Sequence, residues 1–194
     1  PGERVMTLMS AGNLATTQAV VSLLEERSKS PEERAPSVLA APSMFQVARL
    51  VADTLHEVIE SHADGGPRAD STFNATLILG GQIAGAPPRL FLIYPEGNFI
   101  EAGDDTPCFQ IGEMKYGRPI LVRAYDAALD FDDALRLMMV SFDSTMKANL
   151  TVGAPLDYLC YETASLQIAD HGRIEGADPQ FQAIAEGWGA ALTD

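Results

Sequence analysis

The first residues whose types and spacing suggest chemistry are Ala11, Gly12 and Asn13, in the stretch "SAGN" that ends the apolar run 5–10. An apolar run followed by Ala-Gly predicts a strand that ends in a turn, and Asn13 is a good N-cap for a helix starting at Leu14. Backbone N–H groups at such a corner can bind an anion or the oxyanion of a tetrahedral intermediate. An ordinary structural turn needs the same residues, so the stretch alone leaves both interpretations open.

Other stretches have the residue types of a site but not the spacing. His56 and His62 in "HEVIESH" are six residues apart, whereas a helical zinc pair needs histidines at i and i+4. The acidic run "DFDD" at 130–133 suits a helix start, where carboxylates complement the dipole. The stretch "GGQIAG" lacks the spacing of a phosphate loop or a dinucleotide site, and no GxSxG elbow exists. We therefore expect no metal and no cofactor.

Composition narrows the class of protein. Of 194 residues, 46% are apolar and 21% are charged, which is ordinary for one globular domain. The formal net charge of −14 argues against nucleic acid as a partner and against docking on an anionic membrane. No apolar run approaches the ~18 residues of a membrane span. Neither Cys108 nor Cys160 has a metal-type or CxxC spacing, so we expect buried, reduced thiols and a cytoplasmic location.

Hydrophobic periodicity predicts helices in pairs and strands in runs. The expected helices are 14–27, 43–62, 114–126, 130–149 and 179–192. The expected strands are 5–10, 73–83, 89–94, 98–102 and 156–166, with a short one around Cys108-Phe109 and a turn at 171–173. Gly80-Gly81 predicts a bulge or a close backbone approach. This order is typical of an α+β layered fold with antiparallel sheets rather than of alternating βαβ units.

Three stretches together resemble the proteasome β-subunit family of N-terminal-nucleophile hydrolases. "SAGNLATTQ" is similar to that family's strand ending in Ala-Gly before the first helix, and "LILGGQIAGAPPRLFLIYPEGNF" to its central hairpin. "QIGEMKYGRP" at 110–119 lies where the family has an Ile-Gly-Ser-Gly-Ser stretch. The resemblance covers essentially all 194 residues and is closest to the bacterial proteasome-like members. It implies one domain over 1–194, a four-layer αββα sandwich of two antiparallel sheets, whose N-terminal strands precede the opening "PGE" turn.

The resemblance also implies site residues. In that family an N-terminal Thr supplies the attacking hydroxyl, its α-amine is the general base, and the Gly of the Ala-Gly pair donates the oxyanion N–H. That glycine is Gly12 here, where a Cβ is expected to crowd the substrate carbonyl. The two family serines fall on Glu113 and Lys115, and a late Asp falls near Asn149. The family's Thr, Asp and Lys precede the Ala-Gly strand, so the chain from Pro1 is expected to be inactive.

The function implied is a subunit of a Thr-type hydrolase that acts on peptide or amide bonds within a ring or spiral homo-oligomer. Met114, Met138, Met139 and Met146 offer adaptable apolar surface for such an assembly, or for the core. The replaced serines leave a second hypothesis open, a non-catalytic assembly subunit of the same fold. A small-ligand domain of unrelated ancestry is a third, and it predicts a monomer.

Overall fold

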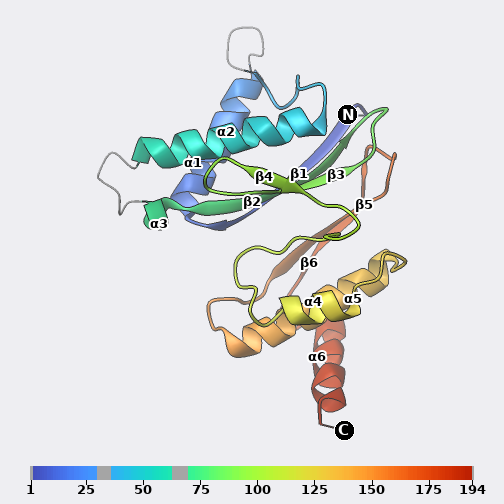
Figure 1. The fold of residues 1–194 in the computed structure, drawn as a ribbon. Helices are drawn as coiled ribbons and strands as arrows, with labels where there is room; N and C mark the ends of the chain where they lie inside the picture. The colour runs from blue at the N-terminus through green and yellow to red at the C-terminus, as the bar shows by residue number, and fades with distance from the viewer. Residues whose placement is uncertain (1, 30–35, 63–69, 194) are drawn as a thin grey trace. The chain divides into compact units, whose positions relative to one another are not determined.

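The computed structural model describes residues 2–29, 36–62 and 70–193. The chain divides into two units, Pro1–Gly112 with Thr163–Gln167 (unit 1), and Glu113–Glu162 with Ile168–Asp194 (unit 2). Each unit has its own sheet (Figure 1). Each also has its own buried apolar cluster. The prolines and mixed charge of 28–42 predict a loop, and "ADGGPRAD" at 63–70 predicts a connector; both lie partly outside the described residues.

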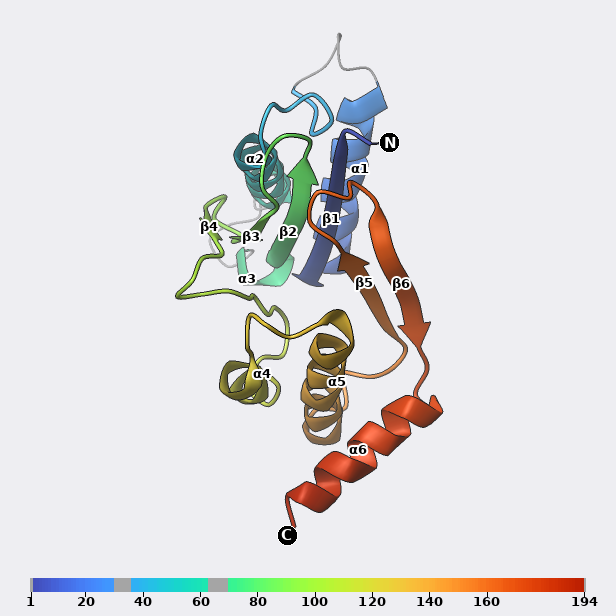
Figure 2. The same cartoon turned by 90° about the vertical axis from the view of Figure 1, so that its right-hand side faces the viewer.

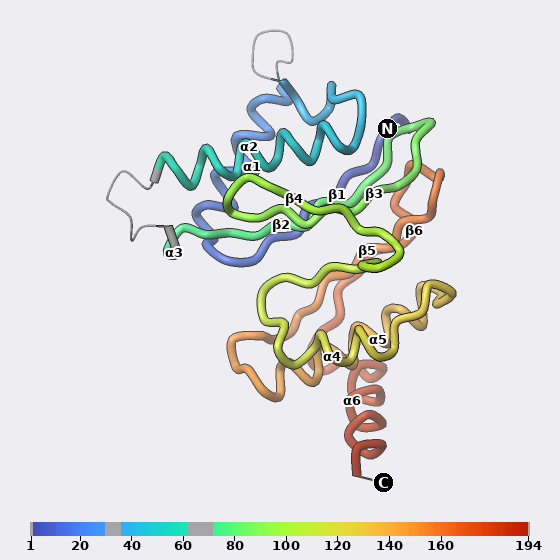
Figure 3. Tube along the Cα trace, in the orientation of Figure 1, coloured from blue at the N-terminus to red at the C-terminus, as the bar shows by residue number. Residues whose placement is uncertain are grey.

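Unit 1 is built on one antiparallel sheet in the order β1-β2-β3-β4. Its strands are β1 (Arg4–Gly12), β2 (Ala75–Ile83), β3 (Arg89–Ile93) and β4 (Phe99–Glu101), and their path is followed most easily in the tube of Figure 3. Gly85 and Gly97, in the turns after β2 and β3, have φ of 80° each, which glycine adopts readily. The antiparallel arrangement predicted from the short loops is confirmed.

Two helices cover one face of this sheet (Figure 2), α1 (Leu14–Lys29) and α2 (Met44–His62). The shared core joins α1, α2, β2 and β3 through apolar side chains that are almost fully buried: Val20, Val47, Val51, Leu55, Leu77, Leu79, Phe91 and Ile93. Arg27 of α1 links the helices by donating to Thr54 Oγ1 and to Glu57, each at 2.7 Å. A short helix that periodicity did not predict, α3 (Asp70–Phe73), precedes β2.

Unit 2 combines three helices with a two-stranded antiparallel sheet. These elements are α4 (Arg118–Ala124), α5 (Phe131–Ala148), β5 (Leu156–Tyr161), β6 (Ile168–Ile174) and α6 (Pro179–Ala191). The buried cluster consists of Met139, Ile174 and Phe181, with partly buried residues from α5, β5 and α6 around it. Helix α4 packs on α5, and α5 on α6.

Several boundaries differ from those that the sequence predicts. The helix expected at 114–126 is shorter, because Pro119 lies in the first turn of α4, where its missing N–H costs no hydrogen bond. The prediction of a turn at 171–173 is wrong, since these residues lie inside β6. Gly172 is needed there because the Tyr158 ring of β5 covers it: an added Cβ would be 2.8 Å from the ring. The strand predicted to reach residue 166 ends at Tyr161.

Two local expectations about glycine and cysteine are also corrected. Gly80-Gly81 forms no bulge, because β1 and β2 pair in one register along their whole length. The close approach is confirmed, since a Cβ at Gly81 would be 2.3 Å from the Val5 carbonyl oxygen. The segment around Cys108 contains no strand, and Cys108 is exposed rather than buried.

The four methionines named above divide between the surface and the core of unit 2. Met139 and Met146 belong to the core of unit 2, whereas Met114 and Met138 are 39% and 43% exposed. Met114 and Met138 therefore offer more contact surface than the other two. Within the described ranges, no helix is both long and apolar enough to cross a membrane.

Candidate oxyanion corner and carboxylate cluster

Gly12 ends β1 in a conformation that only glycine adopts without strain. Its φ is 115°, and an added Cβ would lie 2.4 Å from the carbonyl oxygen of Asn74 and 3.0 Å from Ala75 Cα. The expectation that a Cβ would crowd a substrate carbonyl is therefore not needed to explain the glycine. The close approach of β2 and the left-handed backbone already require it.

The direction of the Gly12 N–H follows from the register of β1 and β2. Asn13 donates to Asn74 O at 2.9 Å, and Ala84 donates to Glu3 O at 2.8 Å, at the two ends of the same ladder. Because bonded and non-bonded pairs alternate in an antiparallel ladder, odd-numbered residues of β1 bond to β2 and even-numbered ones direct N–H and C=O away from it. The Gly12 N–H thus points to the edge of β1 that no other strand in the described ranges occupies.

The corner after Gly12 is held by several hydrogen bonds that Asn13 and Thr16 make. Asn13 caps α1 by accepting from the Thr16 N–H at 3.0 Å, as the sequence predicts, and its Nδ2 donates to Thr72 O at 2.9 Å. The Thr16 hydroxyl donates to Phe73 O at 2.8 Å and is almost fully buried. These bonds fix the peptide planes on both sides of the turn, so the Gly12 N–H has a defined direction.

Gly112 lies beside this corner within unit 1. Its φ is 79°, and an added Cβ would be 3.5 Å from the Ala11 Cβ, an ordinary contact distance. The "QIG" part of the stretch 110–119 therefore ends, at Gly112, next to Ala11, the residue that precedes Gly12. The sequence did not predict this contact, since nothing local links residues so far apart along the chain.

Two of the candidate site residues, Glu113 and Asn149, contact each other in unit 2. The Glu113 carboxylate accepts from the Lys115 backbone N–H at 2.8 Å through Oε1 and from Asn149 Nδ2 at 2.9 Å through Oε2. The Lys115 N–H first, and the Asn149 amide second, hold the pKa of Glu113 below its usual range. The cluster therefore presents an ionised carboxylate, which can accept hydrogen bonds or attract a cation but cannot act as an acid near neutral pH.

A third residue of this cluster, Thr151, was missed from the sequence. Its N–H and its hydroxyl both donate to Asn149 Oδ1, at 2.9 and 2.7 Å, which turns the Asn149 amide nitrogen toward Glu113. Asn149 itself ends α5, its N–H donating to Thr145 O at 2.8 Å. The signal that could have revealed Thr151 is the Asn-x-Thr spacing, since Asn often accepts from the backbone two residues on.

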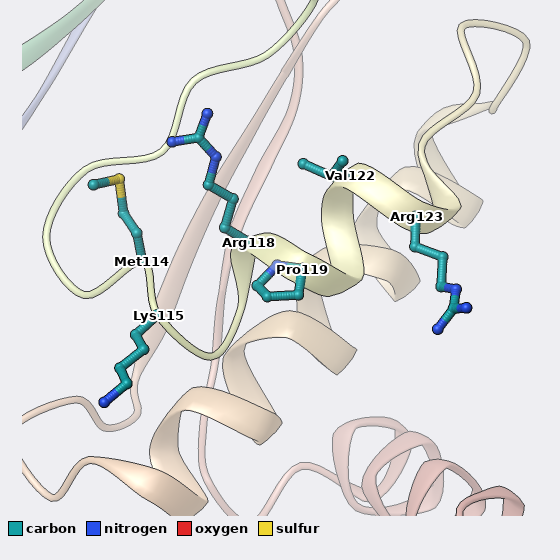
Figure 4. A pocket seen from close by; sticks show the side chains of 6 residues that line it. All are labelled: Met114, Lys115, Arg118, Pro119, Val122 and Arg123. Atoms are coloured by element: carbon teal, nitrogen blue, oxygen red, sulfur yellow. The ribbon is translucent and has the colours of Figure 1, made fainter.

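Lys115 contributes chiefly its backbone N–H to the cluster, and its charge also lowers the pKa of Glu113 as a smaller cause. Its ammonium lies over the Tyr116 ring, 5.6 Å from the centroid, and lines a shallow depression at α4 (Figure 4). The structure thus brings Glu113 and Asn149 together, while the Lys115 ammonium lies over the Tyr116 ring. Gly12 belongs to unit 1 and these three residues to unit 2. Among the described residues, no group of three or more His, Cys, Asp or Glu could hold a metal ion.

Comparison with solved structures identifies close relatives, although no protein-family model and no curated protein matches the chain. The Gly-1 mutant of Anbu from Hyphomicrobium sp. strain MC1 is 47% identical with a TM-score of 0.89, covering 100% of this chain and 79% of that one. Anbu from Yersinia bercovieri, described as an ancestral beta-subunit, is 45% identical with a TM-score of 0.89 and the same coverage. The Anbu complex from Pseudomonas aeruginosa, described as a helical assembly, is 43% identical with a TM-score of 0.88 and also covers 100% and 79%.

Identity above 40% over the whole chain, with a matching fold, is well beyond what a shared fold alone requires. The resemblance of "SAGNLATTQ", the central hairpin and "IGEMKYGRP" to bacterial proteasome-like proteins is thereby confirmed. The chain belongs to the Anbu family of proteasome-like proteins.

Proposed function

We propose that the full-length protein is a subunit of a homo-oligomeric N-terminal-nucleophile hydrolase that cleaves peptide or other amide bonds. The observation that carries this proposal is the Gly12 N–H, which is directed to the unpaired edge of β1 from a corner held by Asn13 and Thr16. Such a donor is what stabilises the oxyanion of a tetrahedral intermediate in amide hydrolysis. Membership of the Anbu family supports the proposal.

The nucleophile in this proposal is an N-terminal Thr that lies outside residues 1–194, together with the Asp and Lys that support it. The Thr hydroxyl attacks the amide carbon, and its own α-amine accepts the proton. The chain matches 79% of the length of the relatives, which leaves room in such proteins for those residues. We further propose that the full-length protein forms a single four-layer αββα domain, with α1 and α2 in one outer layer and α4 and α5 in the other.

Self-assembly is supported by the relative from Pseudomonas aeruginosa, described as a helical assembly. For this chain we propose a homo-oligomer of ring or spiral form. The net charge of −14 means that copies repel one another at long range, so the contacts between them need locally complementary surfaces.

A non-catalytic assembly subunit remains the second candidate, favoured by the cluster in unit 2. Glu113 and Asn149 replace a Ser and an Asp of the proteasome pattern, and they hold each other at the end of α5. That arrangement serves a structural purpose without any substrate.

The experiment that separates the two candidates uses the full-length protein. N-terminal sequencing and intact mass are expected to show a free Thr after processing, and fluorogenic peptide amides are expected to be cleaved. Replacing that Thr with Ala should abolish turnover while leaving oligomer size unchanged. Absence of a free Thr, together with no turnover, would favour the assembly subunit.

Two further measurements test the site itself. The ¹⁵N–¹H signal of Gly12 is expected to shift strongly when a peptide boronate forms a tetrahedral adduct, because the N–H then donates to a negatively charged oxygen. A chain whose mass shows that it starts at Pro1 is expected to have no turnover, and measurable cleavage by that chain would overturn the assigned nucleophile.

A further inference from the structure

Three consecutive backbone carbonyl groups just before β2 accept hydrogen bonds from the start of α1. Asn13 donates twice, from Nδ2 to Thr72 O at 2.9 Å and from its N–H to Asn74 O at 2.9 Å. Between these two bonds, the Thr16 hydroxyl donates to Phe73 O at 2.8 Å. The first two carbonyl groups belong to the end of α3, and the third links α3 to β2. We call these three bonds the α1–α3 junction.

The α1–α3 junction lies where the strand ladder ends. The last pair of β1 and β2 is Gly12 with Ala75, and beyond it one chain enters α1 while the other comes from α3. The end of a ladder frays easily unless other bonds hold it. The backbone of Gly12 is therefore supported by the ladder on one side only, and the junction supports it on the other.

Thr16 is the buried member of the junction. Its residue is 1% exposed, so water cannot replace its hydroxyl as a donor to Phe73 O. A threonine in the first turn of a helix can instead bond within its own turn, as Thr17 does by donating to Asn13 O at 3.1 Å. Thr16 bonds to a residue 57 positions away, so its hydroxyl serves the junction and not the helix.

The direction of an oxyanion donor matters as much as its presence. The donor must lie about 2.7–3.1 Å from the oxygen that becomes negative, and a misplacement of about 1 Å can lower the rate about 100-fold. Gly12 has a φ of 115° and no side chain, so its own conformation restrains the backbone little. The hydrogen bonds of its neighbours must therefore set the direction of its N–H.

We propose that Thr16 is a positioning residue for the oxyanion donor. By bonding to Phe73 O, its hydroxyl holds Asn74 O against the Asn13 N–H, and so fixes the direction of the Gly12 N–H without touching the substrate. The catalytic part of this inference rests on the proposed hydrolase function. A displaced donor weakens binding of the transition state and leaves binding of the substrate intact, so kcat is expected to fall while KM stays the same.

The test compares two neighbouring threonines in the full-length protein. Thr16→Val replaces the hydroxyl that bonds to Phe73 O with a methyl group, and Thr17→Val does the same to a hydroxyl that bonds within α1. With a fluorogenic peptide amide, Thr16→Val is expected to lower kcat at least about tenfold and to leave KM within about twofold. Thr17→Val should keep kcat within about twofold, and Thr16→Ser, which retains the hydroxyl, should recover most of it.

Amide hydrogen exchange at single-residue resolution tests the junction without any activity. Thr16→Val is expected to speed exchange of the residue-13 amide at least about tenfold relative to Thr17→Val, because that amide donates to Asn74 O. Asn13→Ser is a second variant for the case that Thr16→Val does not assemble. Serine can still cap α1, but its side chain is too short to replace the bond to Thr72 O, so the same faster exchange and lower kcat are expected.

The outcomes separate this inference from the proposed function. If the wild-type protein cleaves no amide, the proposed function fails, and exchange of the residue-13 amide alone decides whether Thr16 holds the junction. Equal exchange in Thr16→Val and Thr17→Val would overturn the inference whatever the activity. With an active wild type, faster exchange without a fall in kcat would also overturn it, as would a fall in kcat that Thr16→Ser does not restore.

Discussion

The end of β1 places two physical demands on residue 12, and replacing Gly12 with alanine violates both of them. The backbone φ of 115° costs any residue with a Cβ about 1–3 kcal/mol. The Cβ would also lie 2.4 Å from Asn74 O, so β1 and β2 must move apart at their ends. Overpacking of this kind costs about 1–3 kcal/mol. The two demands act together, so Gly12→Ala is expected to lower the free energy of unfolding by roughly 2–6 kcal/mol.

Three other glycines provide matched controls for these two demands. Gly85 has φ of 80° and nothing within 4 Å of an added Cβ, so Gly85→Ala tests backbone strain alone. At Gly81 the φ is not left-handed but a Cβ would be 2.3 Å from Val5 O, so Gly81→Ala tests the overlap alone. Gly103 has neither feature. Its change to alanine should be within about 0.5 kcal/mol of neutral.

The assay is amide hydrogen exchange across β1 and β2, which reports the stability of unit 1 without requiring the whole protein to unfold in one step. Gly12→Ala should lose protection by more than either partial control and by about their sum, since the control sites do not share its contacts. If Gly12→Ala exchanges no faster than Gly85→Ala, the overlap with Asn74 is relieved without cost and the reasoning is refuted. Gly12→Pro would not isolate the N–H, because proline requires φ near −65°.

Three further predictions concern the packing of Gly172 in unit 2 and the hydrogen bonds that the Gln82 and Asn149 side chains make. Gly172→Ala should displace the Tyr158 ring, which lies 2.8 Å from the added Cβ, and so lower the unfolding midpoint. In a double-mutant cycle, Tyr158→Ala in the same chain should relieve much of that loss of stability. Gln82→Leu should speed exchange of the Ala164 amide, because the buried Gln82 Oε1 accepts from it at 2.8 Å while Nε2 donates to Ala86 O at 2.6 Å. Each backbone group left unsatisfied costs about 1–3 kcal/mol. Asn149→Ala should raise the low pKa of Glu113, measured by carboxyl NMR titration. Because folding lowers the pKa of Glu113, this carboxylate stabilises the fold at pH values above the pKa of an unfolded-chain Glu, ~4.3. The contribution is lost as the pH falls through the pKa of the folded state. An unchanged Glu113 pKa in Asn149→Ala would contradict the assigned hydrogen bond.

Much of the fold follows from sequence because its signals are local. The period of α2 and α5 and the turns around Gly85 and Gly97 predict elements within a few residues of their observed bounds. The errors arise where tertiary contacts decide. His171-Gly172-Arg173 looks like a turn by composition, yet Gly172 lies in a strand, where it pairs with Tyr158 of β5 and is covered by the Tyr158 ring. Nothing in the neighbouring residues carries that information.

The candidate site divides in the same way. Asn13 as the cap of α1 was predicted, since the capping hydrogen bond is local. Glu113 and Asn149 each came from family resemblance as candidate positions, but the hydrogen bond that joins them across 36 residues was not predicted. Thr151 was missed because its role exists only once Asn149 is oriented toward a partner from another part of the chain.

The identity of residue 12 therefore says less about catalysis than the direction of its backbone N–H does. Either a hydrolase or an assembly subunit with this sheet needs glycine there, because Asn74 O leaves no space for a Cβ in both cases. The N–H is different. No hydrogen bond of the described fold uses it, although the bonds on both sides fix its orientation through Asn13 and Thr16. A strand edge that alternates bonded and free N–H groups supplies an oxyanion donor without any dedicated side chain, and a hydrolase built on it needs only a nucleophile placed beside that edge.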